Sequence, residues 1–259
     1  MKKIRSRFLC LLTLSMLMIS FSTNGIVHAQ NIEARIRENT GIISHESINI
    51  DQEMNDINYF SDNPIVDNDL MIIADELRNL KVHGATDDEL NVYAKKRMEE
   101  TEVKLSRETS DLDSYITGNL NAQEQALYNS NVAYGLLCMA NGKLAIGYAE
   151  DNYISSVLHN GNGDAFRHTL WNFGMVIDVG YNFAKSWSDA HENGTVNNPA
   201  LEKQMDLYNN SVGLNLGLTY PGTVLHSTFI NTTKTQVRNG KCKIIVNSNL
   251  QPSNSSGEK

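Results

Sequence analysis

The sequence predicts a mainly α-helical protein, a helical bundle that ends in a small C-terminal β-hairpin. Apolar residues recur at intervals of three and four along several segments, which is the period of an amphipathic helix. Glycine, proline and asparagine separate these segments, as they commonly do between helices. β-like patterning is found only near the C-terminus, where two short segments flank a turn signal.

Residues 1–29 predict a secretory signal peptide. Four basic residues precede an apolar run, Phe8 to Phe21, which is shorter than the roughly 20 residues of a membrane span. The compact side chains of Val27 and Ala29 place the expected cleavage after Ala29. We therefore expect a secreted or envelope-associated protein, with an uncleaved membrane anchor as the alternative.

Cleavage at this position would leave a strongly acidic chain. It would remove four of the 22 basic residues and none of the 30 acidic ones, which leaves a net charge of −12. A nucleic-acid surface needs a basic patch, so we expect no nucleic-acid partner, and no stable membrane span after cleavage. The expected partner is an unidentified envelope or extracellular substrate. An acidic cleft that holds a cation is compatible with this charge.

The region before the core divides into an arm and a helical part. Residues 30–66 are polar and acidic, and they predict a poorly ordered arm. Residues 67–118 predict an N-terminal helical region, whose first helix covers Asp67–Leu80. The second begins with Thr86 and Glu89, which have the spacing of a capping box, and it runs to about Leu105.

Residues 119–246 form the predicted helical core domain. Asn121 and Glu124 have the spacing of another capping box, and Asn141-Gly142 is a helix stop signal. The helices expected after this stop are Lys143–Leu158, Asp164–Val179, Tyr181–Glu192 and Pro199–Leu218.

A hairpin is predicted at the end of the core domain. Thr235–Arg238 and Lys241–Val246 are β-like and flank Asn239-Gly240, a typical two-residue turn. Residues 247–259 contain mostly polar residues and proline, and they predict a disordered tail.

The mature chain retains two cysteines, Cys138 and Cys242. An exported protein could join them in one disulfide. The alternative is that Cys138, within the apolar run 135–140, is an isolated core cysteine.

Three short segments place polar side chains on consecutive helices of the predicted core. They are Gly163–His168, Ala190–Glu192 and Met205–Asn210. Buried polar groups cost free energy unless they are paired or bound to a ligand. Their recurrence on three helices therefore predicts one polar site inside an otherwise apolar bundle.

Helical spacing indicates which of these side chains face the bundle. Asp164 and His168 share one face of their helix, and Asp206 and Asn210 share a face of theirs. His191 follows an apolar stripe on the helix between them. The candidate site residues are Asp164, Arg167, His168, His191, Glu192, Asp206, Asn209 and Asn210.

The leading hypothesis is a metal-assisted hydrolase in which Asp164, His168, His191 and Asp206 are ligands of a divalent metal. Two imidazole nitrogens with carboxylate oxygens suit zinc, whereas a site richer in oxygen favours manganese or magnesium. Such a metal lowers the pKa of bound water to about 7 and so supplies a nucleophile.

Three further residues have supporting roles in this hypothesis. Glu192 is the candidate general base, although its direction at the helix end is not fixed by the pattern. Asn209 and Asn210 are candidate binding residues, because amides orient ligands and substrates by hydrogen bonding.

Two other interpretations stay open. The first is metal-free acid–base catalysis by His168 and His191, with Arg167 stabilising an anion. The second is a non-catalytic secreted binding or structural module, in which the buried polar network fixes the packing of the helices. Single residues also have simpler explanations, since Arg167 could merely neutralise Asp164 and a lone histidine is often a core residue.

The three segments resemble those of a family of mostly bacterial, largely exported domains of unknown function. The shared motifs are D-A-F-R-H, A-H-E and M-D-x-x-N-N-x-x-G, which stand here at Asp164–His168, Ala190–Glu192 and Met205–Gly213. The chain departs from the family at Tyr208, where histidine is common. The resemblance covers roughly residues 120–240 and implies an all-helical core with a shared polar site, but no established reaction.

A fainter similarity connects the chain to zinc-dependent phospholipase C and related nucleases, which are helical and use Asp and His ligands. The chain lacks their larger set of histidines.

Overall fold

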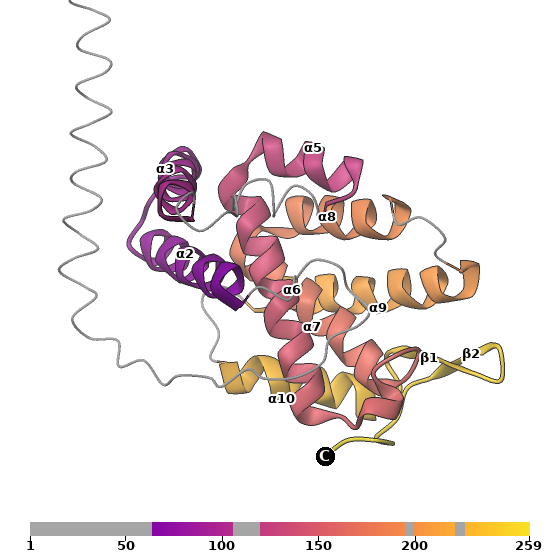
Figure 1. Cartoon of the computed structure of the whole chain (residues 1–259). Helices are drawn as coiled ribbons and strands as arrows, with labels where there is room; N and C mark the ends of the chain where they lie inside the picture. The colour runs from indigo at the N-terminus through magenta and orange to yellow at the C-terminus, as the bar shows by residue number, and fades with distance from the viewer. Residues whose placement is uncertain (1–63, 106–119, 195–198, 221–225) are drawn as a thin grey trace, which may run out of the picture. The chain divides into compact units, whose positions relative to one another are not determined.

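The computed structural model describes residues 64–105, 120–194, 199–220 and 226–259. Within these ranges it contains eight α-helices and one two-stranded antiparallel sheet, which confirms the predicted helical class with a small C-terminal hairpin (Figure 1). None of the helices in these ranges has the length and apolar character that crossing a membrane requires. The predicted signal peptide and residues 30–63 of the predicted arm lie outside the described residues.

The first two helices are α2 (Pro64–Val82) and α3 (Asp87–Leu105). α3 begins with the expected capping box: the backbone amide of Thr86 donates to the Glu89 carboxylate at 2.7 Å, and the Glu89 amide donates to Oγ1 of Thr86 at 3.3 Å. The apolar face of α2 is fully buried and packs against α3 and α6.

The expected helix break at Asn141-Gly142 is wrong. The chain breaks earlier, between α5 (Ala122–Ser130) and α6 (Val132–Asn152), because the side chain of Asn131 accepts a hydrogen bond from the amide of Tyr134 and caps the start of α6. Nδ2 of Asn141 donates to the carbonyl of Leu137 at 2.8 Å and to Asp178 at 2.7 Å. These partners satisfy a polar side chain inside a helix, so α6 continues through it.

Helix α7 (Asn162–Val179) is the most enclosed element of the core. A short 3-10 helix (Ser155–Val157) precedes it, and it packs against α6, α8 (Tyr181–Gly194), α9 (Ala200–Thr219) and α10 (His226–Arg238). Gly213 permits the close approach of α9, because a Cβ at this position would lie 2.2 Å from the carbonyl oxygen of Thr169. The carbonyl belongs to the α7 backbone, which cannot move aside easily.

The C-terminal hairpin lies later in the chain than predicted. Residues 235–238 belong to α10, and Gly240 ends that helix with φ of 70° while the Lys241 amide donates to the carbonyl of Gln236 at 3.0 Å. The Asn-Gly pair therefore acts as a helix C-cap.

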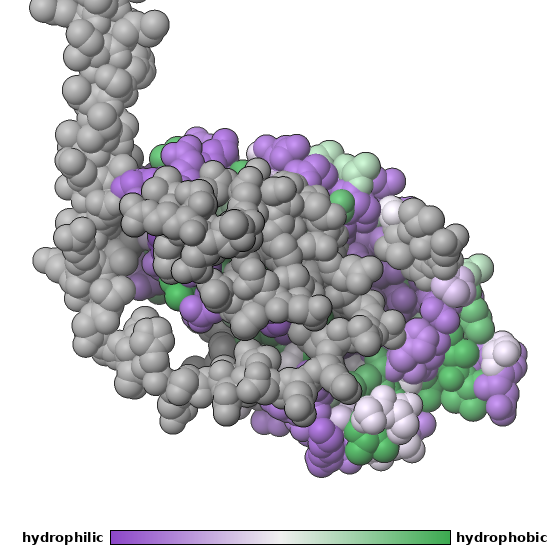
Figure 2. Space-filling view, in the orientation of Figure 1, coloured by the Kyte–Doolittle hydropathy of each residue, from purple (hydrophilic) through white to green (hydrophobic). Residues whose placement is uncertain are grey.

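The hairpin itself joins β1 (Lys243–Val246) to β2 (Asn249–Pro252). Its turn residues, Asn247 and Ser248, both have positive φ, at 49° and 59°, as a tight hairpin turn requires. The predicted disordered tail from residue 247 thus contains a strand. Figure 2 shows hydrophobic surface over this hairpin, where Val246 is exposed.

Both cysteines are buried and free. Sγ of Cys242 lies 3.3 Å from Oγ1 of Thr169 on α7, and Cys138 is inside α6. The disulfide alternative is therefore not observed, and each thiol is a core side chain.

Candidate functional site

Two side chains at the start of α7 form the first part of the site. Asp164 stands in the first turn, and His168 follows one turn later on the same face. Each residue is 3% exposed. Oδ1 of Asp164 accepts a hydrogen bond from Arg167 and lies 3.5 Å from Nε2 of His168, while its Oδ2 accepts from the backbone amide of Asn160 at 2.6 Å.

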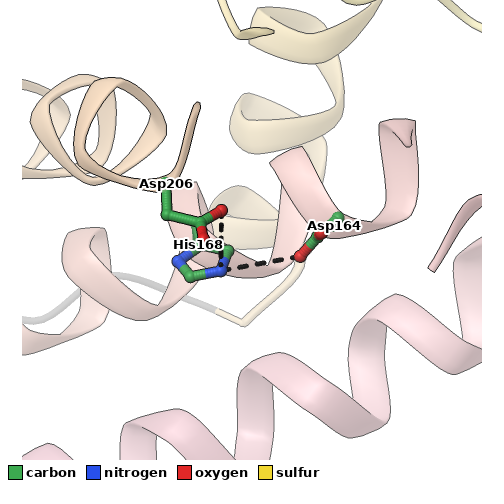
Figure 3. Close-up of side chains that lie close together, drawn as sticks. All are labelled: Asp164, His168 and Asp206. Carbon is green, nitrogen blue, oxygen red and sulfur yellow. Dashed lines mark ion pairs between the residues drawn. The ribbon is translucent and has the colours of Figure 1, made fainter. Parts of the chain in front are cut away.

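Helix α9 adds a second carboxylate to this pair. Oδ1 of Asp206 lies 3.2 Å from Nε2 of His168, so the imidazole nitrogen faces both carboxylates (Figure 3). The ligand atoms of Asp164, His168 and Asp206 all lie within 4.8 Å of one another. Ligands about 2.1 Å from a tetrahedral metal ion are about 3.4 Å apart, so the 3.5 Å and 3.2 Å separations from Nε2 suit a bound cation.

The negative charge of the Asp206 carboxylate is poorly balanced by neighbouring donors and cations. Its side chain is 13% exposed, and Oδ1 has no hydrogen-bond donor with acceptable geometry among the described residues. Burial raises its pKa to about 9, and the negative charges of Asp164 and Glu192 act in the same direction. Without a cation, Asp206 is therefore protonated at neutral pH.

The pKa values of His168 and Asp164 are lowered, whereas that of Asp206 is raised. Burial lowers the pKa of His168 to about 4, and the charge of Arg167 lowers it further against the attraction of Asp164 and Glu192. Burial alone would raise the pKa of Asp164, but the charges of Arg167 and His168 and the amide of Asn160 outweigh it, and the pKa is lowered. A neutral imidazole and an ionised carboxylate are the forms that bind metals.

The other nitrogen of His168 faces a network of amides. Nδ1 lies 3.0 Å from Oδ1 of Asn210, and Nδ2 of Asn210 donates to Oε1 of Glu192 at 3.0 Å. Nδ2 of Asn172 donates to Oδ1 of Asn210 at 2.7 Å. Glu192 is also 3.7 Å from Nδ1. The structure thus places Glu192 and Asn210 at the nitrogen of His168 that faces away from Asp164 and Asp206.

His191 is held by a different group of side chains. Its Nδ1 lies 2.9 Å from Oε1 of Glu124, and its ring packs edge-on against Trp171 with centroids 5.1 Å apart. The indole nitrogen of Trp171 donates to the carbonyl of Cys138 at 2.9 Å. The structure does not bring His191 into the group of converging ligand atoms formed by Asp164, His168 and Asp206.

Asn209 and Tyr208 also point away from the three ligand atoms. The side chain of Asn209 donates to the carbonyl of Lys243 at 2.9 Å and accepts from its amide at 2.8 Å, which fastens the hairpin to α9. Tyr208, at the position where histidine is common, is half exposed beneath the ammonium group of Lys243.

The sequence reasoning missed three residues of the site. Asn172 follows His168 by four residues, so helical spacing alone could have identified it. Glu124 has the spacing of a capping residue, and nothing in the sequence links it to His191. Asn160 acts through its backbone amide, which leaves no signal in its side chain.

Comparisons with curated proteins and with solved structures give no match. A comparison with protein families matches residues 125–241, a range that contains α7, α8 and α9, the helices that carry Asp164, His168, Glu192, Asp206 and Asn210. The matching family is described as Domain of unknown function (DUF6973). The match identifies a domain of unknown function at residues 125–241.

Proposed function

We propose that the core domain binds a divalent cation through Asp164, His168 and Asp206 and uses it to hydrolyse an ester-linked substrate. The convergence of one imidazole nitrogen and two carboxylate oxygens from α7 and α9 carries this proposal, because their separations suit a common ion. The protonated Asp206 supports it as well, since a cation would take the place of a proton that burial imposes.

The donor set suits catalysis as well as binding. Three protein ligands leave a coordination position for water or substrate, as in hydrolytic zinc sites. A bound cation would supply a water of lowered pKa and polarise the substrate. Asp206 is the most exposed of the three ligands, so the open position is expected on its side. Arg167 balances the charge of Asp164.

This arrangement favours metal-assisted over metal-free histidine chemistry. In the metal-free alternative, His168 and His191 would exchange protons with a substrate. Nε2 of His168 instead faces two carboxylates, and Nδ1 of His191 faces Glu124.

Metal analysis of the purified protein tests the proposal. We expect one equivalent of Zn²⁺ or Mn²⁺ by elemental analysis and calorimetry, lost in His168→Ala and retained in His83→Ala, whose site lies in the turn between α2 and α3. Chelation should abolish cleavage of ester substrates, and metal should restore it. Stoichiometric binding that persists in His168→Ala, or no binding in the wild type, would refute the cation site.

A non-catalytic module is the second candidate function. The observation that favours it is the network of His168, Asn172, Asn210 and Glu192, which joins α7, α8 and α9 through buried side chains. Cation binding that raises thermal stability, with no hydrolysis of any ester in a broad screen, would select this candidate over the hydrolase.

We also propose that the chain is exported and acts outside the cytoplasm or in the cell envelope. The basic start and short apolar run of residues 1–29 support this. N-terminal sequencing of the secreted protein should give Gln30 as the first residue. A protein retained with Met1 would contradict cleavage.

A further inference from the structure

The orientation of the Asn210 amide is fixed by its neighbours. Its Nδ2 lies 3.0 Å from Oε1 of Glu192, and a carboxylate can only accept hydrogen bonds. A flipped amide would place oxygen against oxygen. Both residues are 2% exposed, so water cannot readily replace the lost bond. Oδ1 of Asn210 must therefore face His168.

A second amide reinforces this orientation. Nδ2 of Asn172 donates one hydrogen to Oδ1 of Asn210 at 2.7 Å and the other to the carbonyl of His168 at 3.0 Å. Asn172 is fully buried, and a flip would set its own oxygen against these two acceptors. Oδ1 of Asn210 is consequently an acceptor for two donors.

The same geometry determines the position of the proton on His168. Oδ1 of Asn210 carries no hydrogen, so the 3.0 Å contact with Nδ1 is a hydrogen bond only if Nδ1 is protonated. A neutral imidazole has one protonated nitrogen. Nε2 then carries a lone pair, which points at the carboxylates of Asp164 and Asp206.

We infer that Asn210, oriented by Glu192 and Asn172, is a positioning residue that holds His168 with its proton on Nδ1 and leaves Nε2 free to bind the cation. Such partners behind a ligating histidine fix its tautomer and ring orientation. The role in binding rests on the proposed cation site, whereas the tautomer belongs to the protein without metal. Glu192 is thus assigned to orienting the ligand rather than to general-base chemistry.

Nitrogen NMR of the metal-free full chain, labelled with ¹⁵N-histidine, tests the tautomer directly. His168 should show a protonated Nδ1 and an unprotonated Nε2 at pH 7, with assignment by loss of the signals in His168→Ala. A proton on Nε2 would overturn the inference even if the cation binds. The expected tautomer without any cation binding would support the inference and refute the proposed function alone.

Asn210→Ala tests the consequence for binding. We expect Zn²⁺ affinity to fall about 10- to 100-fold, with mixed tautomers at His168. The matched control is Asn141→Ala, which also removes a buried amide with two hydrogen bonds, but at the opposite end of α7. Unchanged tautomer and affinity in folded Asn210→Ala would overturn the inference. If Asn210→Ala does not fold, the tautomer of His168 in the wild type still tests the inference.

Discussion

Asp178, in the last turn of α7, and Asp206, on α9 beside the first turns of α7, are carboxylates with the same side-chain exposure, 13%. Asp178 accepts hydrogen bonds from Nε of Arg78 at 2.9 Å and from Nδ2 of Asn141 at 2.7 Å. Oδ1 of Asp206 has no hydrogen-bond donor within the described ranges and shares its surroundings with Asp164 and Glu192. Burial is thus common to both sites, and the supply of donors and positive charge distinguishes a structural carboxylate from a candidate ligand.

The largest expected difference between the two carboxylates is in cation binding. Asp206→Asn removes a charged ligand and should weaken Zn²⁺ or Mn²⁺ binding by about 100-fold or more, because even the loss of an indirect partner costs up to that amount. Asp178→Asn should change the affinity less than about threefold. Isothermal calorimetry measures both. An equal loss of cation affinity in Asp206→Asn and Asp178→Asn would show that Asp206 is not a specific ligand.

The helix contacts near the two carboxylates differ as well. Gly213→Ala forces a Cβ against the Thr169 carbonyl, 2.2 Å away, and should lower the free energy of unfolding by about 2–3 kcal/mol despite better helix propensity. Gly174→Ala meets the side-chain oxygen of Asn141, and a side chain shifts more readily than backbone, so this variant should cost less, about 1 kcal/mol.

Urea unfolding measures both glycine variants. Cation affinity should also fall in Gly213→Ala, since α9 carries Asp206, and should be retained in Gly174→Ala. A Gly213→Ala variant with the same free energy of unfolding as the wild type would show that the α7–α9 contact is not tight.

The two carboxylates should have opposite effects on the stability of the metal-free protein. Asp178→Ala removes an acceptor that Arg78 and Asn141 share, which leaves Arg78 with Asp75 and Asn141 with the carbonyl of Leu137, and it should lower the free energy of unfolding by about 2 kcal/mol. Asp206→Asn removes a poorly compensated acid and should raise it by up to about 1 kcal/mol. Chemical denaturation at pH 7 in the presence of a chelator separates the two. Destabilisation of similar size in both variants would mean that Asp206 is as well partnered as Asp178.

The last expected difference concerns the pH dependence of stability. The pKa of Asp206 is raised from 3.8 to about 9, so the folded state retains a proton that the unfolded state loses, and stability decreases as pH rises through this interval. The pKa of His168 is lowered from 6.5 to about 4, so its contribution is lost as pH falls through that range. The two trends oppose each other below pH 6.5, and above it only Asp206 contributes.

Metal-free wild type should therefore lose stability between about pH 6.5 and 9. Asp206→Asn should reduce this slope, which unfolding curves at several pH values would detect. A slope of unchanged size in Asp206→Asn would assign the titration to another group.

Helical spacing predicted much of the candidate site. Asp164 and His168 are four residues apart on one helix, and Asp206 and Asn210 are four apart on another, so their shared faces could be deduced without a structure. Their meeting depends on how closely α9 approaches α7, a property of the packing at Gly213. Periodicity gives the direction of a side chain around its own helix, but not the distance to a neighbouring helix.

The adjacent residues His191 and Glu192 show where spacing failed. Near the end of a short helix, the pattern favoured His191 as the buried member. In the structure Glu192 is 2% exposed and joins the network behind His168, whereas His191 turns to Glu124 on α5. The contact with Glu124, on a helix distant in the sequence, determines where the His191 side chain points. The misplaced hairpin has a local cause, because an Asn-Gly pair can end a helix as readily as it can form a turn.

Neighbouring asparagines on α9 perform separate tasks in adjacent directions. Asn209 holds both backbone groups of Lys243 in the hairpin, and Asn210 holds the imidazole of His168. One turn of α9 therefore contacts both the C-terminal hairpin and the buried His168. A redesign of the hairpin should therefore preserve both hydrogen bonds between Asn209 and Lys243. If their loss lets α9 turn about its axis, Asn210 moves away from the imidazole of His168.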